Sequence, residues 1–129
     1  MELISNEDDE GAHCLGPTAL RQLRISKVIS LVSLPAEIRH VTTLQSLFIN
    51  DCPSLVSLPE WIGDLNSLRR LYIENCPGLI SLPEGIRRLT SLRELSIVEC
   101  PHLEKRCERG TGEDWPKIAH VPHFSNQRF

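Results

Sequence analysis

The sequence lacks a long hydrophobic run and an excess of positive charge. None of its apolar runs approaches the roughly 18 residues that a transmembrane helix requires. Its formal net charge is −3, which gives no electrostatic basis for binding nucleic acid or an anionic membrane. The first twenty residues contain neither the basic segment nor the apolar segment of a secretory signal. We therefore expect neither nucleic-acid nor membrane partners.

Motifs for catalysis and nucleotide binding are also missing. There is no G-x-S-x-G elbow, no H-E-x-x-H pair and no G-x-x-x-x-G-K-S/T phosphate loop. His102, Cys107, His120 and His123 lie close together near the C-terminus, but they lack the spacing of metal ligands. The sequence thus predicts no enzyme, no metal site and no cofactor.

The five cysteines do not form C-x-x-C pairs. Cys52, Cys76 and Cys100 instead follow one another at intervals of 24 residues, so each belongs to a repeated pattern. We expect them to be buried, reduced thiols that pack as small hydrophobic side chains. This use of cysteine fits a reducing compartment and predicts a cytoplasmic location.

The dominant feature of the sequence is a repeat of 24 residues. Segments 44–67 and 68–91 are identical at 13 of 24 positions. The apolar positions continue the period on both sides: leucine at 20, 44, 68 and 92, leucine at 23, 47, 71 and 95, and isoleucine at 25, 49, 73 and 97. A fixed period that contains L-x-x-L-x-L is typical of leucine-rich repeats.

This period predicts an α/β leucine-rich-repeat solenoid with a parallel concave sheet and short convex helices or turns. About four repeats are expected over residues 20–103: 20–43, 44–67, 68–91 and a partial copy at 92–103. Residues 1–19 are interpreted as an acidic flexible leader or a degenerate repeat. Residues 104–129 are interpreted as a C-terminal cap and tail, with Trp115 as its main plug. Because no polar cap is evident on the N-terminal side, Leu23, Ile25 and Leu31 are expected to face water or the leader.

Within each repeat, the alternating L-x-I segment predicts a short strand whose leucine and isoleucine point inward. The residues between them then point outward onto the concave face and form the candidate partner-binding surface. They are Gln22, Arg24, Ser26, Ser46, Phe48, Asn50, Arg70, Tyr72, Glu74, Glu94, Ser96 and Val98. Two neighbouring aromatic residues beside an arginine have the composition of interface anchors, although the same pair would also stabilise adjacent strands.

Charge is also ordered along the predicted strands. Arginines stand at their N-terminal ends, at positions 21, 69, 70 and 93, and acidic residues stand at their C-terminal ends, at positions 51, 74 and 99. Lys27 and Glu94 break this pattern. A surface with two poles suits a protein partner better than a polyanion. A mixed, solvated face remains an alternative interpretation.

The repeat L-x-x-L-x-I-x-x-C-P-x-L-x-x-L-P-E-x-I-x-x-L resembles the cytosolic leucine-rich repeats of plant nucleotide-binding disease-resistance proteins. The ending, with Gly112-Glu113-Asp114-Trp115 and His120-Val121-Pro122, is similar to the C-terminal end of their coiled-coil class. The resemblance implies a protein-interaction module of an immune receptor, for effector or host-protein recognition and autoinhibition. The implied partners are a pathogen effector, a guarded host protein or the receptor's own nucleotide-binding domain. A stand-alone intracellular repeat scaffold in signalling, similar to the repeat proteins of Ras-type pathways, is the alternative.

Overall fold

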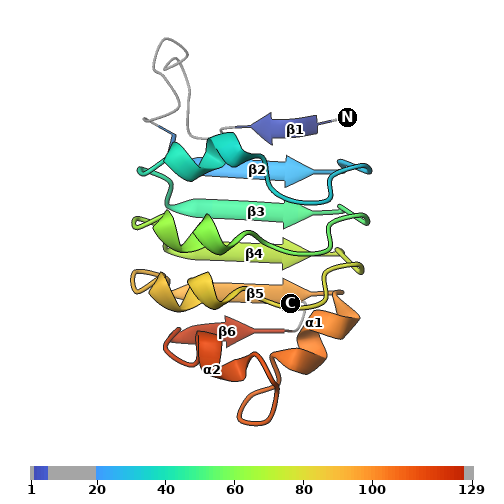
Figure 1. Cartoon of the computed structure of the whole chain (residues 1–129), viewed down its shortest axis with the longest axis vertical. Coiled ribbons are helices and arrows are strands. Elements are labelled where there is room, and N and C mark those ends of the chain that lie inside the picture. Colours follow the sequence, from blue (N-terminus) through green and yellow to red (C-terminus); the bar gives the residue numbers. More distant parts are fainter. Residues whose placement is uncertain (1, 6–19, 127–129) are drawn as a thin grey trace.

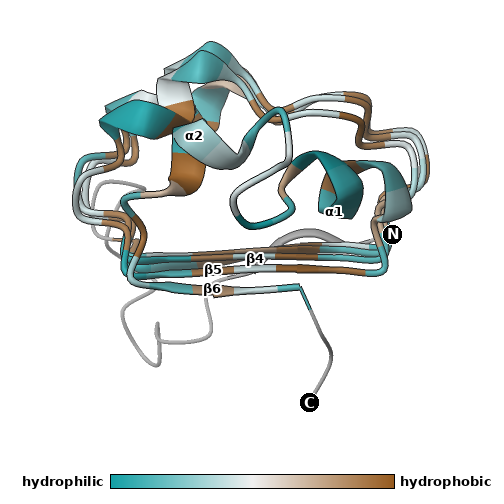
Figure 2. Cartoon of the chain, turned by 90° about the horizontal axis from the view of Figure 1, so that it is seen from below, coloured by the Kyte–Doolittle hydropathy of each residue, from teal (hydrophilic) through white to brown (hydrophobic). Residues whose placement is uncertain are grey.

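The computed structural model describes residues 2–5 and 20–126, and it contains one sheet covered on one side by short helices (Figures 1 and 2). The six strands follow one another in the order of the sequence. They are β1 (Glu2–Ser5), β2 (Gln22–Ser26), β3 (Ser46–Asn50), β4 (Arg70–Glu74), β5 (Glu94–Val98) and β6 (His123–Ser125). Strands β2 to β6 are parallel, which confirms the predicted leucine-rich-repeat solenoid.

The 24-residue period becomes the register of the sheet. Each residue of β2 to β4 pairs with the residue 24 positions later, so that Leu23, Leu47, Leu71 and Leu95 form one inward column. All four are at most 1% exposed. No single repeat can bury these leucines alone, because each needs the next repeat as the other wall of its core.

The return segments complete the core from the other side of the molecule. After each Leu-Pro step the chain forms a short 3-10 helix: η2 (Ala36–His40), η3 (Glu60–Asp64) and η4 (Glu84–Arg88). The proline precedes the helix in an extended conformation, as expected of a residue with a fixed φ. Each helix places one isoleucine inward, and Figure 2 shows the helical layer lying across from the sheet.

Neighbouring return helices are joined where glycine allows a close approach. The Glu60 carboxylate in η3 accepts hydrogen bonds from the backbone N–H groups of Gly85 at 2.7 Å and Glu84 at 3.3 Å. A Cβ atom on Gly85 would lie 2.1 Å from the carbonyl oxygen of Glu60. Trp61 occupies the equivalent position one repeat earlier, and η2 and η3 accordingly pack less closely than η3 and η4.

The repeated cysteines lie in the core, as predicted. Cys52, Cys76 and Cys100 are free, fully buried thiols, and the Cys76 backbone N–H group lies 3.4 Å from Cys100 Sγ. Burial raises the pKa of Cys52, which keeps this thiol protonated and unreactive at neutral pH.

The chain leaves each of four strands through a residue with a left-handed backbone. These residues are Lys27, Asp51, Asn75 and Glu99, with φ between 54° and 59°. Asparagine and aspartate tolerate this region, whereas other side chains crowd the following carbonyl group. The turn is therefore strained in the repeats that carry lysine or glutamate.

Replacing Lys27 with asparagine is expected to raise the free energy of unfolding by about 0.5–1 kcal/mol, since the new side chain relieves this strain. Lys27 is exposed, and the bond from its backbone N–H to the Asn50 carbonyl group would be retained. Urea denaturation measures the change. An unchanged or lower stability would show that the strain at this turn is negligible.

The N-terminal end differs from the sequence interpretation. Residues 2–5 were expected to be part of a flexible leader, but they form β1, which pairs with β2 in the antiparallel direction. Of the residues expected to face water or the leader, Leu23 and Ile25 are at most 1% exposed and Leu31 is half-buried. β1, which belongs to that leader, continues the sheet beyond β2, while Leu47 and Ile49 lie in register on the other side. The rest of the leader, 6–19, lies outside the described residues.

The C-terminal segment packs against the last repeats, but Trp115 is not its main plug. The helices α1 (Pro101–Arg106) and α2 (Trp115–Ile118) precede β6. Ile118 and Val121 are buried, whereas Trp115 is only half-buried. The most deeply buried polar group there is Asp114, which is 0% exposed. Its carboxylate accepts hydrogen bonds from the Leu82 backbone, Arg106 and Lys117.

Candidate functional site

The outward-facing side of β2 to β6, called here the open face, carries the twelve residues that the sequence assigned to a binding surface. Registered pairing arranges them in three columns that cross the strands. The first column is Gln22, Ser46, Arg70 and Glu94, the second is Arg24, Phe48, Tyr72 and Ser96, and the third is Ser26, Asn50, Glu74 and Val98. The return helices lie on the other side of the sheet (Figure 2).

The second column forms a stacked row. The Arg24 guanidinium carbon lies 4.7 Å from the centre of the Phe48 ring. The Phe48 and Tyr72 rings are stacked, with centroids 5.1 Å apart and an interplanar angle of 23°. Cation–π and stacked aromatic contacts each stabilise such a row by about 0.5–1.5 kcal/mol. The row therefore links three strands and presents rigid aromatic surface on the open face.

Glu94 ties this row to the first column. The Tyr72 hydroxyl group donates a hydrogen bond to Glu94 Oε1, while Glu94 Oε2 lies 3.8 Å from Arg70 Nε. Burial and the hydrogen bond to the Glu94 carboxylate raise the pKa of Tyr72 to about 12. The phenol therefore remains a protonated hydrogen-bond donor at neutral pH and holds its ring in a fixed orientation.

Tyr72 is the only tyrosine in the chain, so its ionisation can be followed directly by ultraviolet absorbance. We expect tyrosinate to form with a midpoint near pH 12, compared with about 10 for an exposed tyrosine. Substituting Glu94→Gln should lower the midpoint toward 10, since it removes the carboxylate that opposes ionisation. A midpoint near 10 in the folded wild-type protein would contradict the contact between Tyr72 and Glu94.

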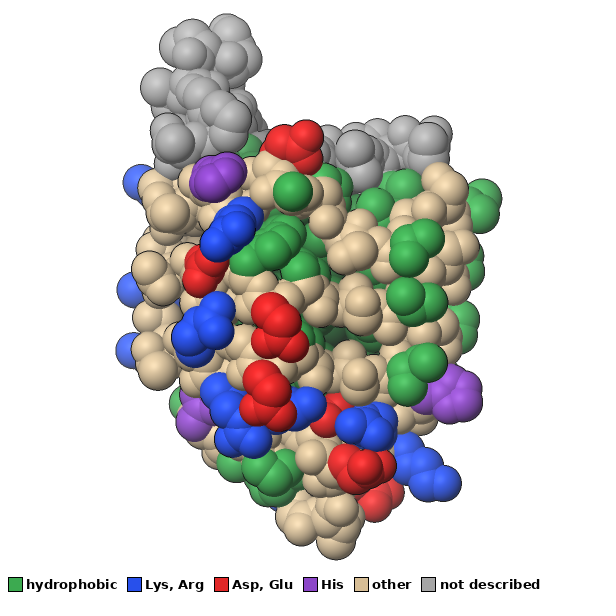
Figure 3. Space-filling view, in the orientation of Figure 1, with side chains coloured by type: hydrophobic (Ala, Val, Ile, Leu, Met, Phe, Trp, Pro, Cys, Tyr) green, Lys and Arg blue, Asp and Glu red, His purple; other side chains and the backbone are tan. Residues whose placement is uncertain are grey.

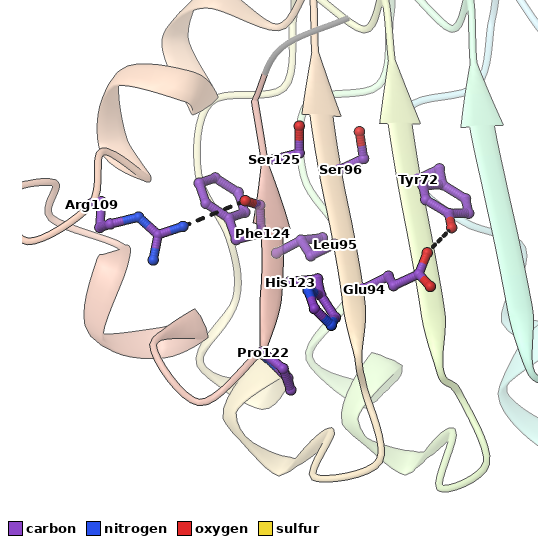
Figure 4. Close-up of a pocket in the computed structure, with 9 residues that line it drawn as sticks. All are labelled: Tyr72, Glu94, Leu95, Ser96, Arg109, Pro122, His123, Phe124 and Ser125. Carbon is purple, nitrogen blue, oxygen red and sulfur yellow. Dashed lines mark hydrogen bonds between the residues drawn. The ribbon is translucent and has the colours of Figure 1, made fainter. Parts of the chain in front are cut away.

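A pocket of about 570 Å³ opens beside this row, where the last repeat meets the C-terminal segment (Figure 4). Tyr72, Glu94 and Ser96 line one side. The other side is formed by the C-terminal segment, with Pro122, His123, Phe124, Ser125 and Arg109. Figure 4 shows β6 running alongside β5, which places His123 beside Glu94 and Ser125 beside Ser96. The pocket thus combines aromatic, basic and hydroxyl groups within reach of one ligand segment.

Most of the twelve predicted residues lie where the sequence placed them. Ten are half-buried on the open face and Arg70 is exposed. Ser46 is the exception, because it is only 4% exposed and offers almost no surface. A small side chain that lies in register between Gln22 and Arg70 is shielded by these longer neighbours. Asn50 has a buried side-chain oxygen without a hydrogen-bond partner among the described residues.

The sequence interpretation missed the residues that the C-terminal segment adds to the open face. His123 and Ser125 extend the first and second columns by one more strand. They follow Glu94 and Ser96 by 29 positions instead of 24, so the repeat period could not reveal them. The weak H-x-S alternation of a three-residue strand gives no usable signal of its own.

Two further features lie away from the open face. Cys107 is fully buried. Its burial and, to a smaller extent, the charge of Asp114 raise the pKa of the thiol to about 12, so that it stays neutral.

On the helical side, Figure 3 shows charged side chains over the helices and a column of hydrophobic side chains beside them. The exposed hydrophobic residues include Val32, Val56 and Ile80, which recur every 24 positions. No group of potential metal ligands and no helix able to cross a membrane occurs in residues 2–5 and 20–126.

Parallel strands with inward leucines and short return helices define a leucine-rich-repeat fold. The family described as leucine-rich repeat region matches residues 5–109, and the chain belongs to this family. Over 21 residues it is 71% identical to a protein of Solanum bulbocastanum that carries the name disease resistance protein RGA1. That similarity covers 16% of this chain and 2% of the relative. Together these matches confirm the resemblance to the leucine-rich-repeat region of a plant disease-resistance protein.

Proposed function

We propose that this chain is a protein-interaction module of a plant intracellular immune receptor. Its open face contributes to the recognition of a pathogen effector or a guarded host protein, or to autoinhibition through the receptor's own nucleotide-binding domain. The module acts in the cytoplasm and has no catalytic role. Its buried free thiols are compatible with that compartment.

The observation that carries this proposal is the row from Arg24 through Phe48 and Tyr72 to Glu94, which crosses four strands and ends at the pocket. Arginine and aromatic residues are enriched among the residues that dominate binding energy at protein interfaces. Their mutual contacts hold them in place before a partner arrives, which lowers the entropic cost of binding. The similarity to a disease resistance protein favours this role over a stand-alone signalling scaffold.

The size of the open face limits the affinity. A stable interface removes about 800 Å² of surface from each partner. Four strands of five residues and one of three offer an area at the low end of that range. We therefore expect this module alone to bind weakly and to act as one part of a longer surface.

The test is a selection of displayed peptides from plant and pathogen proteins on the immobilised chain, followed by calorimetry with Phe48→Ala and Tyr72→Ala. At least a tenfold loss of affinity is expected for each variant. Ile80→Ala, an exposed apolar residue on the helical side, is the matched control and should bind as the wild type does. Selected peptides that bind both aromatic variants unchanged would refute the proposal.

A further inference from the structure

A second pocket, of about 360 Å³, adjoins the first at the N-terminal ends of β4, β5 and β6. It is called here the basic pocket and is lined by Arg69, Arg70, Arg93, Glu94, Pro122 and His123. Three arginines and one glutamate therefore line it. Such an excess of positive charge within one concavity favours an anionic ligand.

The backbone of the sheet fixes the spacing of these groups. The Arg69 carbonyl oxygen accepts hydrogen bonds from the backbone N–H groups of Arg93 at 2.8 Å and Glu94 at 3.0 Å. The Arg93 carbonyl oxygen accepts one from His123 at 3.0 Å. The backbones at Arg69 and Arg93 are thus held one strand apart, about 4.8 Å, at the N-terminal ends of β4 and β5. Like charges opposite each other on neighbouring strands repel, and a shared anion relieves that repulsion.

The carboxylate in the basic pocket does not neutralise these two arginines. Glu94 accepts the Tyr72 hydroxyl bond through Oε1 and lies 3.8 Å from Arg70 through Oε2. Neither Arg69 nor Arg93 has an ion-pair partner among the described residues 2–5 and 20–126. Both side chains belong to exposed residues. They are therefore available to bind a carboxylate through paired N–H groups.

The two pockets share Glu94, Pro122 and His123 and are therefore adjacent. Together they are called here the groove, which has a basic end and an aromatic end. We infer that this groove binds an extended acidic peptide segment. This inference rests on the proposed function of the open face as a protein-binding surface. A glutamate or aspartate side chain of the partner lies against Arg69 and Arg93. A neighbouring aromatic or aliphatic side chain enters the larger pocket beside Tyr72. The Glu94 carboxylate repels a polyanion such as nucleic acid, whereas a peptide with separated charges avoids it.

The test uses a short fluorescein-labelled peptide that carries two glutamates next to a phenylalanine, with binding measured by fluorescence anisotropy. A dissociation constant on the order of 10–100 µM is expected for a groove of this size. Arg69→Glu and Arg93→Glu should each weaken binding at least tenfold. Lys105→Glu changes the net charge equally on the exposed side of α1 and should bind as the wild type does. A peptide with glutamines in place of the glutamates should lose most of its affinity, and added salt should weaken binding of the acidic peptide.

Equal binding of the glutamate and glutamine peptides, or unchanged binding by both arginine variants, would overturn the inference. Displacement by inorganic phosphate, together with unchanged binding after the peptide phenylalanine becomes alanine, would also overturn it, because the groove would then be a simple anion site. If the acidic peptide fails while other selected peptides still require Phe48 and Tyr72, this inference is wrong and the proposed function stands. Thermal unfolding of each variant verifies that the fold is intact.

Discussion

Replacing Asp114 with asparagine is expected to lower the free energy of unfolding by about 3–5 kcal/mol. The Asp114 carboxylate is completely buried and accepts four hydrogen bonds. The donors are the Leu82 backbone N–H group, Lys117 Nζ, and Nε and Nη2 of Arg106. The carboxylate thereby joins α1, α2 and the third repeat at a single point. Asparagine would present hydrogen-bond donors to these donors and would leave the cations without their counter-charge.

Glu113→Gln is the matched control for this prediction. Glu113 is the adjacent residue and contacts the same arginine at 3.0 Å, but its side chain is 76% exposed. Its removal should change stability by no more than about 0.5 kcal/mol. Urea denaturation of both variants gives the comparison. Similar small effects for the two substitutions would show that the buried ion pairs do not hold the C-terminal segment to the repeats.

The same carboxylate is expected to make the stability of the protein sensitive to acid. Burial opposes its ionisation, but the hydrogen bonds from Arg106, Lys117 and Leu82 more than offset this and lower the pKa of Asp114. A group whose pKa is lower in the folded state stabilises the protein above the unfolded pKa, about 3.9 for aspartate. That stabilisation is lost as the pH falls through the lowered value. The wild-type protein should therefore lose stability below about pH 4, and Asp114→Asn should lose less over the same interval.

The second large effect is expected from Leu71→Ala, which should cost about 3–5 kcal/mol. Leu71 is 0% exposed, and it lies in register between Leu47 and Leu95 at the centre of the stack. Truncation leaves a cavity against repeats on both sides, since each leucine forms part of the core of its neighbours. Chemical denaturation measures the loss.

Val56→Ala removes an apolar side chain of the same stack that is 45% exposed, and it serves as the control. It should cost less than about 1 kcal/mol, because the side chain is already largely solvated. If Leu71→Ala cost no more than the control, the repeats would not depend on the shared column of leucines for their stability.

The repeated positions of the sequence predicted the fold well, because each inward residue packs in the core in the same way in every repeat. Leucine and isoleucine at a period of 24 fixed the strands, their register and the direction of Arg24, Phe48 and Tyr72 at the same time. The open face follows from this alternation alone, since side chains along a strand alternate between its two sides. The burial of Ser46 could not be predicted from the alternation, because it depends on the sizes of the neighbouring side chains.

The ends of the chain could not be predicted in this way because they break the period. Glu2–Ser5, which form an antiparallel strand, match no position of the repeat. The H-F-S segment of β6 follows β5 by 29 residues instead of 24. Trp115 is only half-buried, whereas Ile118, Val121 and Asp114 are buried. The hydrogen-bond partners of Asp114 include Leu82 and Arg106, which are 32 and 8 residues away. A contact of that separation has no signature in a single sequence.

Only part of the candidate site could therefore be predicted from the sequence. Its aromatic row belongs to the repeats, whereas His123, Phe124 and Arg109 come from the segment that follows them. The arginines at the N-terminal ends of the strands were recognised as one pole of a bipolar surface. The basic pocket that they line exists only because Pro122 and His123 pack beside β5. Recognition of a partner is thus expected to depend on the junction between the last repeat and its cap.

The most direct test of this account is a chemical-shift map of the isotope-labelled protein during titration with a peptide selected by display. The open face is predicted to respond, with the largest changes at Phe48, Tyr72, Glu94 and His123 and little change on the return helices. Changes confined to the exposed hydrophobic column of Val32, Val56 and Ile80, with none on the open face, would contradict it.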